Sequence, residues 1–78
     1  MTIEVLFFGA TADVVGTRRK QIETQGGVVG DLLHQLIIGH PELERHKLLF
    51  SVNQEYVPTD SEIRDGDEIG IFTAVSGG

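Results

Sequence analysis

The sequence contains no cysteine. This absence excludes a disulfide framework, a thiolate metal site and a thiol nucleophile. Basic residues are also few, because six Lys and Arg stand against twelve Asp and Glu, and the formal net charge is −6. Nucleic-acid-binding proteins usually carry a basic patch, whereas the densest basic run here is Arg18-Arg19-Lys20. We therefore expect no nucleic-acid partner, and an acidic surface that attracts basic proteins.

Long hydrophobic runs are missing too. No apolar run approaches the ~20 residues that a membrane-spanning helix needs. The N-terminus, Met1-Thr2-Ile3-Glu4, lacks the basic region that opens a signal peptide. We expect a cytoplasmic protein without membrane contact.

The chain has 78 residues, which predicts a single domain over 1–78. A domain this small buries only about 60% of the surface that its unfolded chain exposes, so a deep active site is hard to build. Catalysis would therefore need a partner protein. The three histidines, His34, His40 and His46, are spaced by six and do not match a helical i, i+4 metal pair. We expect no metal site.

Hydrophobic periodicity predicts an α+β domain. Val29, Leu32, Leu33 and Leu36 stand at i, i+3, i+4 and i+7 and form one apolar stripe of a main helix. Runs rich in β-branched and aromatic residues predict about five strands. The expected strands cover 2–8, 19–24, 48–53, 55–57 and 68–73, and the expected helical segments cover 9–16, 28–39 and 41–46. Such strands form one sheet with the main helix on one face.

Alternation within the first and last strands assigns the two faces of this sheet, since successive side chains point to opposite sides. Glu4 and Glu68 cannot lie in the core, so the set facing the helix is predicted to be Ile3, Val5, Phe7, Ile69 and Ile71. Leu6, Phe8 and Phe72 remain on the open face. They are either scattered exposed apolar residues, which are normal, or, if the two strands are neighbours, a patch that marks a protein interface. We favour the patch.

The chain ends in a short uncharged tail over 73–78 that closes with Gly77 and Gly78. It could be a frayed terminus. It could instead be a reactive arm, because an extended tail of this length reaches about 20 Å. Two residues without a Cβ atom can enter a channel that is too narrow for side chains. The carboxylate of Gly78 can then be activated by adenylation inside a partner.

Four segments carry a family resemblance in the expected order. They are Val5-Leu6-Phe7-Phe8-Gly9, Val52-Asn53-Gln54-Glu55-Tyr56-Val57, Asp65-Gly66-Asp67-Glu68-Ile69 and Val75-Ser76-Gly77-Gly78. Together they resemble the small subunit of molybdopterin synthase, the MoaD-like sulfur carriers of the MoaD/ThiS ubiquitin-like family. The resemblance covers essentially the whole chain. It implies a β-grasp fold whose first and last strands are adjacent and parallel.

The resemblance also implies a mechanism and partners. A MoeB-like adenylyltransferase, related to ubiquitin-activating enzymes, would adenylate Gly78 with ATP and magnesium. Sulfur from a persulfide donor would then form a thiocarboxylate. The charged chain would dock on the MoaE-like large subunit, with Gly77 passing through its channel, and donate sulfur to cyclic pyranopterin monophosphate. The chain would thus be the sulfur-donating subunit of the synthase, without a bound cofactor and not catalytic alone. The implied interface residues are Phe8, Tyr56, Phe72, Val75 and Ser76.

Two features depart from the family pattern. The family often has a Pro-Pro pair where this chain has Thr73-Ala74, and a Thr cap on the main helix where this chain has Gly26-Gly27-Val28, so we expect Gly27 to cap. Asp67 and Glu68 are candidates for contacts with a basic partner near the tail. Sulfur carriers for thiamine or tungsten-cofactor synthesis, a ubiquitin-like protein modifier, and a non-catalytic β-grasp binding module remain possible functions.

Overall fold

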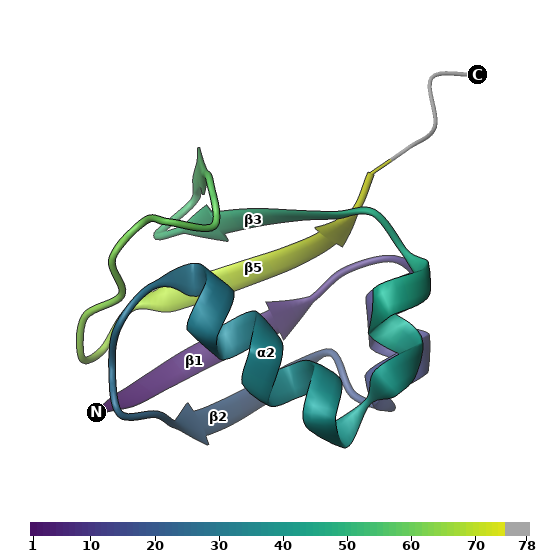
Figure 1. Ribbon diagram of the computed structural model, residues 1–78, viewed down its shortest axis with the longest axis horizontal. Helices are drawn as coiled ribbons and strands as arrows, with labels where there is room; N and C mark the ends of the chain where they lie inside the picture. The colour runs from purple at the N-terminus through teal and green to yellow at the C-terminus, as the bar shows by residue number, and fades with distance from the viewer. Residues whose placement is uncertain (75–78) are drawn as a thin grey trace.

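A computed structural model describes residues 1–74, and residues 75–78 lie outside the described part (Figure 1). All the predicted elements are present there, with ends that differ from the prediction by no more than one residue. The strands are β1 (Thr2–Phe7), β2 (Arg19–Glu23), β3 (Leu48–Val52), β4 (Glu55–Val57) and β5 (Glu68–Thr73). The helices are α1 (Ala10–Val15), α2 (Val29–Gly39) and a 3₁₀ helix, η1 (Pro41–Arg45).

The strands form one mixed sheet in the order β2-β1-β5-β3-β4. The chain's last strand therefore lies between its first and third strands (Figure 1). β1 and β5 run parallel, with Glu4 paired to Glu68 and Phe7 to Ile71. The other neighbouring strands run antiparallel. The expected α+β, β-grasp architecture is confirmed, including the adjacent and parallel first and last strands.

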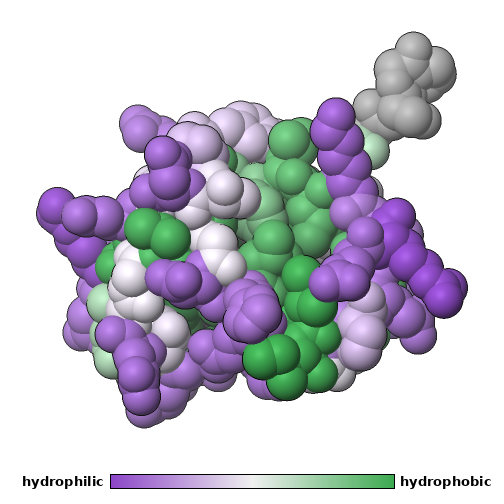
Figure 2. Space-filling model, in the orientation of Figure 1, coloured by the Kyte–Doolittle hydropathy of each residue, from purple (hydrophilic) through white to green (hydrophobic). Residues whose placement is uncertain are grey.

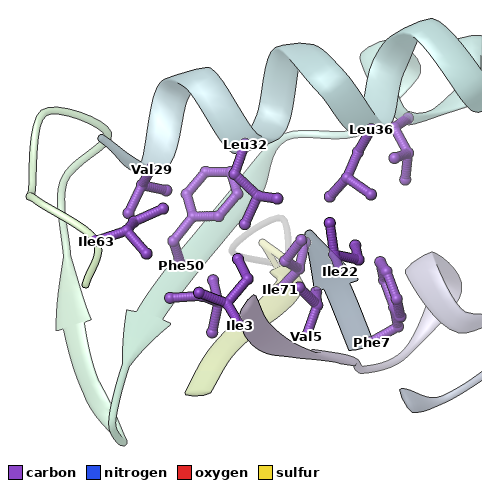
Figure 3. Close-up of a cluster of buried hydrophobic side chains, with 12 residues drawn as sticks. Ile3, Val5, Phe7, Ile22, Val29, Leu32, Leu36, Phe50, Ile63 and Ile71 are labelled. Atoms are coloured by element: carbon purple, nitrogen blue, oxygen red, sulfur yellow. The ribbon is translucent and has the colours of Figure 1, made fainter. Parts of the chain in front are cut away.

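The core lies between the sheet and α2, which packs across one face (Figure 3). All five strand residues predicted to face the helix are at most 2% exposed. α2 contributes Val29, Leu32 and Leu36, while Leu33 is only partly buried at the edge of the cluster. Each large apolar side chain that is fully buried stabilises the fold by roughly 1.5–3 kcal/mol. The core occupies only one face of the sheet, so side chains on the opposite face are available for contacts with other molecules.

The start of α2 differs from the prediction that Gly27 caps it. Val28 is the N-cap, and the carboxylate of Asp31 accepts a hydrogen bond from the Val28 N–H at 3.0 Å. The next two N–H groups donate to backbone carbonyls in the loop over 59–61. The N–H groups that a helix start leaves unpaired are thus satisfied without a Thr hydroxyl, so a Gly-Gly-Val start is tolerated.

The hairpin between β3 and β4 turns through Asn53 and Gln54, whose φ angles are +49° and +73°. Two positive φ values in succession are typical of a type I′ turn, in which Asn is favoured. The Asn53 amide donates to Asp67 at 3.0 Å and accepts from the N–H of Glu68 at 3.0 Å. These bonds fix the hairpin to the start of β5.

Along residues 1–74, no helix is both long and apolar enough to cross a membrane.

Candidate functional site

The open face of the sheet carries an aromatic cluster on three strands or their ends. Phe8 follows β1, Tyr56 lies on β4 and Phe72 lies on β5. The rings of Phe8 and Phe72 are stacked, with centroids 4.5 Å apart and planes inclined by 3°. The Tyr56 ring is tilted against Phe72 at 5.5 Å. Phe8 and Phe72 are therefore neighbours, as the predicted patch requires, and Tyr56 joins them. The role of these residues at a protein interface stays a prediction.

Two contacts hold Phe8 in this position. Its N–H donates to the carbonyl of Ile71 at 2.9 Å, which extends the β1–β5 pairing by one residue. Thr11, which is fully buried, donates its hydroxyl to the carbonyl of Phe8 at 2.6 Å and lies 3.2 Å from that of Ile71. Thr11, at the start of α1, thus links Phe8 to the end of β5. Thr11 was not identified from the sequence, since a threonine in a short helix carries no distinctive signal.

Leu49 belongs to the same surface and was not predicted from the sequence as part of it. It pairs with Phe72 across the β3–β5 ladder and is 44% exposed. The alternation of β3 does separate Leu49 and Ser51 from Leu48, Phe50 and Val52. That signal places Leu49 on the open face once β3 is known to neighbour β5. We define the aromatic patch as Leu6, Phe8, Leu49, Tyr56 and Phe72.

A shallow hollow of about 160 Å³ opens beside the aromatic patch. Gly70 lies at its base, between Leu6 on β1 and Ser51 on β3. A Cβ atom on Gly70 would collide with Oγ of Ser51 and would come within 3.0 Å of the Phe72 ring. A glycine at this point of β5 therefore lets the Ser51 side chain and the Phe72 ring close over the strand, and Gly70 itself is buried. The remaining walls come from Gln54, Tyr56 and Glu68, together with the rings of Phe8 and Phe72.

The base of the tail lies at the end of β5 nearest the aromatic patch. Thr73, which was also expected to begin the tail, is the last residue of β5 and pairs with Leu48. The N–H of Ala74 then donates to the carbonyl of Lys47 at 2.7 Å. The other predicted tail residues, Val75, Ser76, Gly77 and Gly78, lie outside the described residues. The tail therefore begins at the same end of the sheet at which Phe8 and Phe72 lie.

The acidic pair predicted near the tail is placed differently by the structure. Asp67 precedes β5, at the strand end remote from the tail. Its two carboxylate oxygens accept hydrogen bonds from the Asn53 amide at 3.0 Å and from the Arg64 N–H at 2.8 Å. Asp67 is thus a structural residue of the turn, and the prediction of a partner contact near the tail is wrong for it. Glu68 instead lines the hollow.

The helix side of the molecule also carries apolar surface. Figure 2 shows apolar side chains between α2 and β3, where a shallow groove includes Leu33, Ile37 and Leu48. The sheet separates this groove from the aromatic patch. Within residues 1–74, no group of three or more His, Asp or Glu could hold a metal ion.

Comparison with known proteins gives a consistent set of similarities. The sequence model of the ThiS family matches residues 5–78. The "Molybdopterin synthase sulfur carrier subunit" of Chlamydomonas reinhardtii is 41% identical, with 100% of both chains covered. The crystal structure of SAMP1, small archaeal modifier protein 1, from Haloferax volcanii is 30% identical, with a TM-score of 0.83 and 100% of both chains covered.

One similar chain comes from a solved complex of two proteins. A solved complex of subunits 1 and 2 of the molybdopterin-converting factor from Helicobacter pylori contains a chain that is 21% identical, with a TM-score of 0.68 and 100% of both chains covered. At this identity the likeness shows the fold alone.

Proposed function

The chain belongs to the ThiS family, and from this membership we propose that it is the sulfur carrier subunit of a molybdopterin synthase, with sulfur carried on Gly78. The observation that carries the proposal is the full-length similarity to relatives of that name, at 41% and 36% identity in Chlamydomonas reinhardtii and Mycobacterium tuberculosis. The family match extends through Gly77 and Gly78.

The chemistry would take place on the terminal carboxylate. Gly78 attacks ATP, held with magnesium by an activating adenylyltransferase, and pyrophosphate leaves. The terminal sulfur of a persulfide donor then displaces AMP, and a thiol releases the donor as a disulfide. A thiocarboxylate remains on Gly78. Because the chain has no cysteine, no thiol of its own competes for the activated carbonyl. The need for ATP makes the cytoplasm the expected location.

The sulfur would be used on a large synthase subunit. The aromatic patch supports this, because exposed aromatic clusters are typical of protein interfaces. The name of the relatives, a subunit of molybdopterin synthase, supports the same kind of partner. Phe8, Tyr56 and Phe72 would dock on the partner, Val75 and Ser76 would continue the contact, and Gly77 would pass through a narrow channel. The thiocarboxylate would then donate sulfur to cyclic pyranopterin monophosphate.

Intact mass spectrometry of the chain purified from its native host tests the proposal. The expected species is heavier than the unmodified chain by the difference between a sulfur and an oxygen atom, and fragmentation locates the change on Gly78. A variant that ends at Ser76 is the control and should stay unmodified. A full-length chain that never acquires sulfur, even with activating enzyme, ATP and a persulfide donor, would overturn the carrier function.

A second candidate, a protein modifier, is favoured by the similarity to SAMP1, the small archaeal modifier protein 1 of Haloferax volcanii. In this case Gly78 would be transferred to a lysine amine, and the product would be an isopeptide. Digestion of cell extract would then yield target peptides whose lysines carry the C-terminal residues of this chain. Thiocarboxylate on Gly78 without such peptides favours the sulfur carrier.

Binding and deletion experiments distinguish the sulfur carrier of a molybdopterin synthase from three more functions of β-grasp domains. A carrier for thiamine synthesis or for tungsten-cofactor synthesis would also acquire the thiocarboxylate, but it would not bind a molybdopterin synthase large subunit at micromolar concentration. A non-catalytic β-grasp binding module would keep its full function when Gly77 and Gly78 are deleted.

A further inference from the structure

The hollow beside the aromatic patch has the chemistry of a site for one cationic side chain. Glu68 and Phe72 flank Gly70 on the same face of β5, since side chains two residues apart share a face. Ser51 and the Phe72 ring close over Gly70 at the base of the hollow, and Leu6 and Tyr56 form part of its walls. The hollow therefore has a carboxylate at one end and aromatic rings at the other.

The Glu68 carboxylate has no hydrogen-bond or ion-pair partner within residues 1–74. Only its backbone groups are engaged, with the side-chain oxygen and the backbone N–H of Asn53. The neighbouring acid on this face, Glu4, differs because it pairs with Arg19. Glu68 is a partly buried residue, and its carboxylate can form charge-assisted hydrogen bonds with a cation supplied by another molecule. The net charge of −6 favours a basic partner in the same way.

The geometry points to an arginine of the docking partner, inserted into the hollow with its guanidinium on Glu68. Arginine fits better than lysine because its planar group binds a carboxylate through two hydrogen bonds. Its aliphatic stem would lie against Leu6 and the rings of the aromatic patch. This inference rests on the proposed function, since the partner is the large synthase subunit. It adds an electrostatic specificity site to an otherwise apolar interface.

The test compares two variants that remove one carboxylate each. Glu68→Gln removes the acid of the hollow. Glu55→Gln removes an exposed acid on β4. Because Glu55 directly precedes Tyr56 in this strand, its side chain points away from the open face. Dissociation constants for the large subunit are measured by calorimetry. We expect Glu68→Gln to raise the Kd about tenfold, since a hydrogen bond to a charged group is lost. Glu55→Gln should bind as the wild type does. Both variants should unfold at the wild-type temperature, because neither carboxylate has a partner within residues 1–74.

The proposed function and the arginine site fail under different outcomes. If the wild-type chain does not bind the large subunit at all, the proposed function fails and the arginine site fails with it. If the wild type binds and Glu68→Gln binds equally well, only the arginine site is overturned. A crystal structure of the complex gives the second readout. An arginine side chain in the hollow with its guanidinium on Glu68 is expected, and a lysine, an apolar side chain or solvent there would contradict it.

Discussion

Tyr56 and Ile38 are the two most exposed large apolar side chains of the described residues, at 71% and 72%. They lie on different sides of the sheet, Tyr56 in the aromatic patch and Ile38 on α2. They therefore form a matched pair for asking whether the patch is the docking surface. Replacing each by alanine removes a similarly exposed apolar group, but only Tyr56→Ala should affect binding.

The expected cost in stability is small for both variants. Each side chain is somewhat less than a third buried, so its loss removes roughly 0.5–1 kcal/mol of the ~1.5–3 kcal/mol for complete burial. Tyr56→Ala also loses the tilted contact with Phe72, which contributes about 0.5–1.5 kcal/mol. A domain of 78 residues has about 4–12 kcal/mol of total stability at ~0.05–0.15 kcal/mol per residue. Both variants should therefore fold.

The expected effect on binding differs. A tyrosine anchor at the centre of an interface typically contributes at least about 2 kcal/mol, which corresponds to roughly 30-fold in Kd. We expect that loss for Tyr56→Ala, measured by calorimetry against the large synthase subunit, and no change for Ile38→Ala. Urea unfolding of both variants is the control for folding. Binding of Tyr56→Ala within about twofold of the wild type, or an equal loss of affinity in Ile38→Ala, would refute the patch as the docking surface.

Three further predictions concern the core, the helix start and the tail. Ile69→Ala, at a fully buried position, should lower the free energy of unfolding by about 2–5 kcal/mol in urea titrations, and a loss below about 1 kcal/mol would contradict the assigned core. Asp31→Ala should cost about 1 kcal/mol, because the Val28 N–H loses its acceptor; unchanged stability would show that this bond contributes nothing. Gly77→Val should leave thermal unfolding unchanged while it blocks sulfur transfer to the large subunit, and normal synthase activity in this variant would exclude the narrow channel.

The core could be predicted from the sequence because one charged residue in each of two strands shows which face of that strand is exposed. Glu4 and Glu68 lie on the same strand faces as Leu6 and Phe72, so the residues on the opposite faces were predicted to be buried. Their positions in the structure pair with each other across β1 and β5. Alternation alone does not reveal which strands are neighbours. The parallel pairing of β1 and β5 came from the family resemblance, and that resemblance is confirmed by the family match.

What the sequence did not reveal depends on contacts between distant segments. Asp67 reads as an ordinary turn carboxylate until the structure brings Asn53 to it. The role of Gly70 needs the ring of Phe72 beside it and Ser51 opposite. Neither contact leaves a local signature in composition or spacing. Sequence periodicity thus predicts which face a residue occupies, whereas the hollow on that face requires the strand order.

The most direct measurement of the central claim is product formation in a reconstituted synthase. The chain is first charged with activating enzyme, ATP and a persulfide donor, and is then mixed with the large subunit and cyclic pyranopterin monophosphate. We predict that molybdopterin forms in proportion to the thiocarboxylate present on Gly78, and that uncharged chain yields none. Fully charged chain that binds the large subunit but yields no molybdopterin would contradict the account.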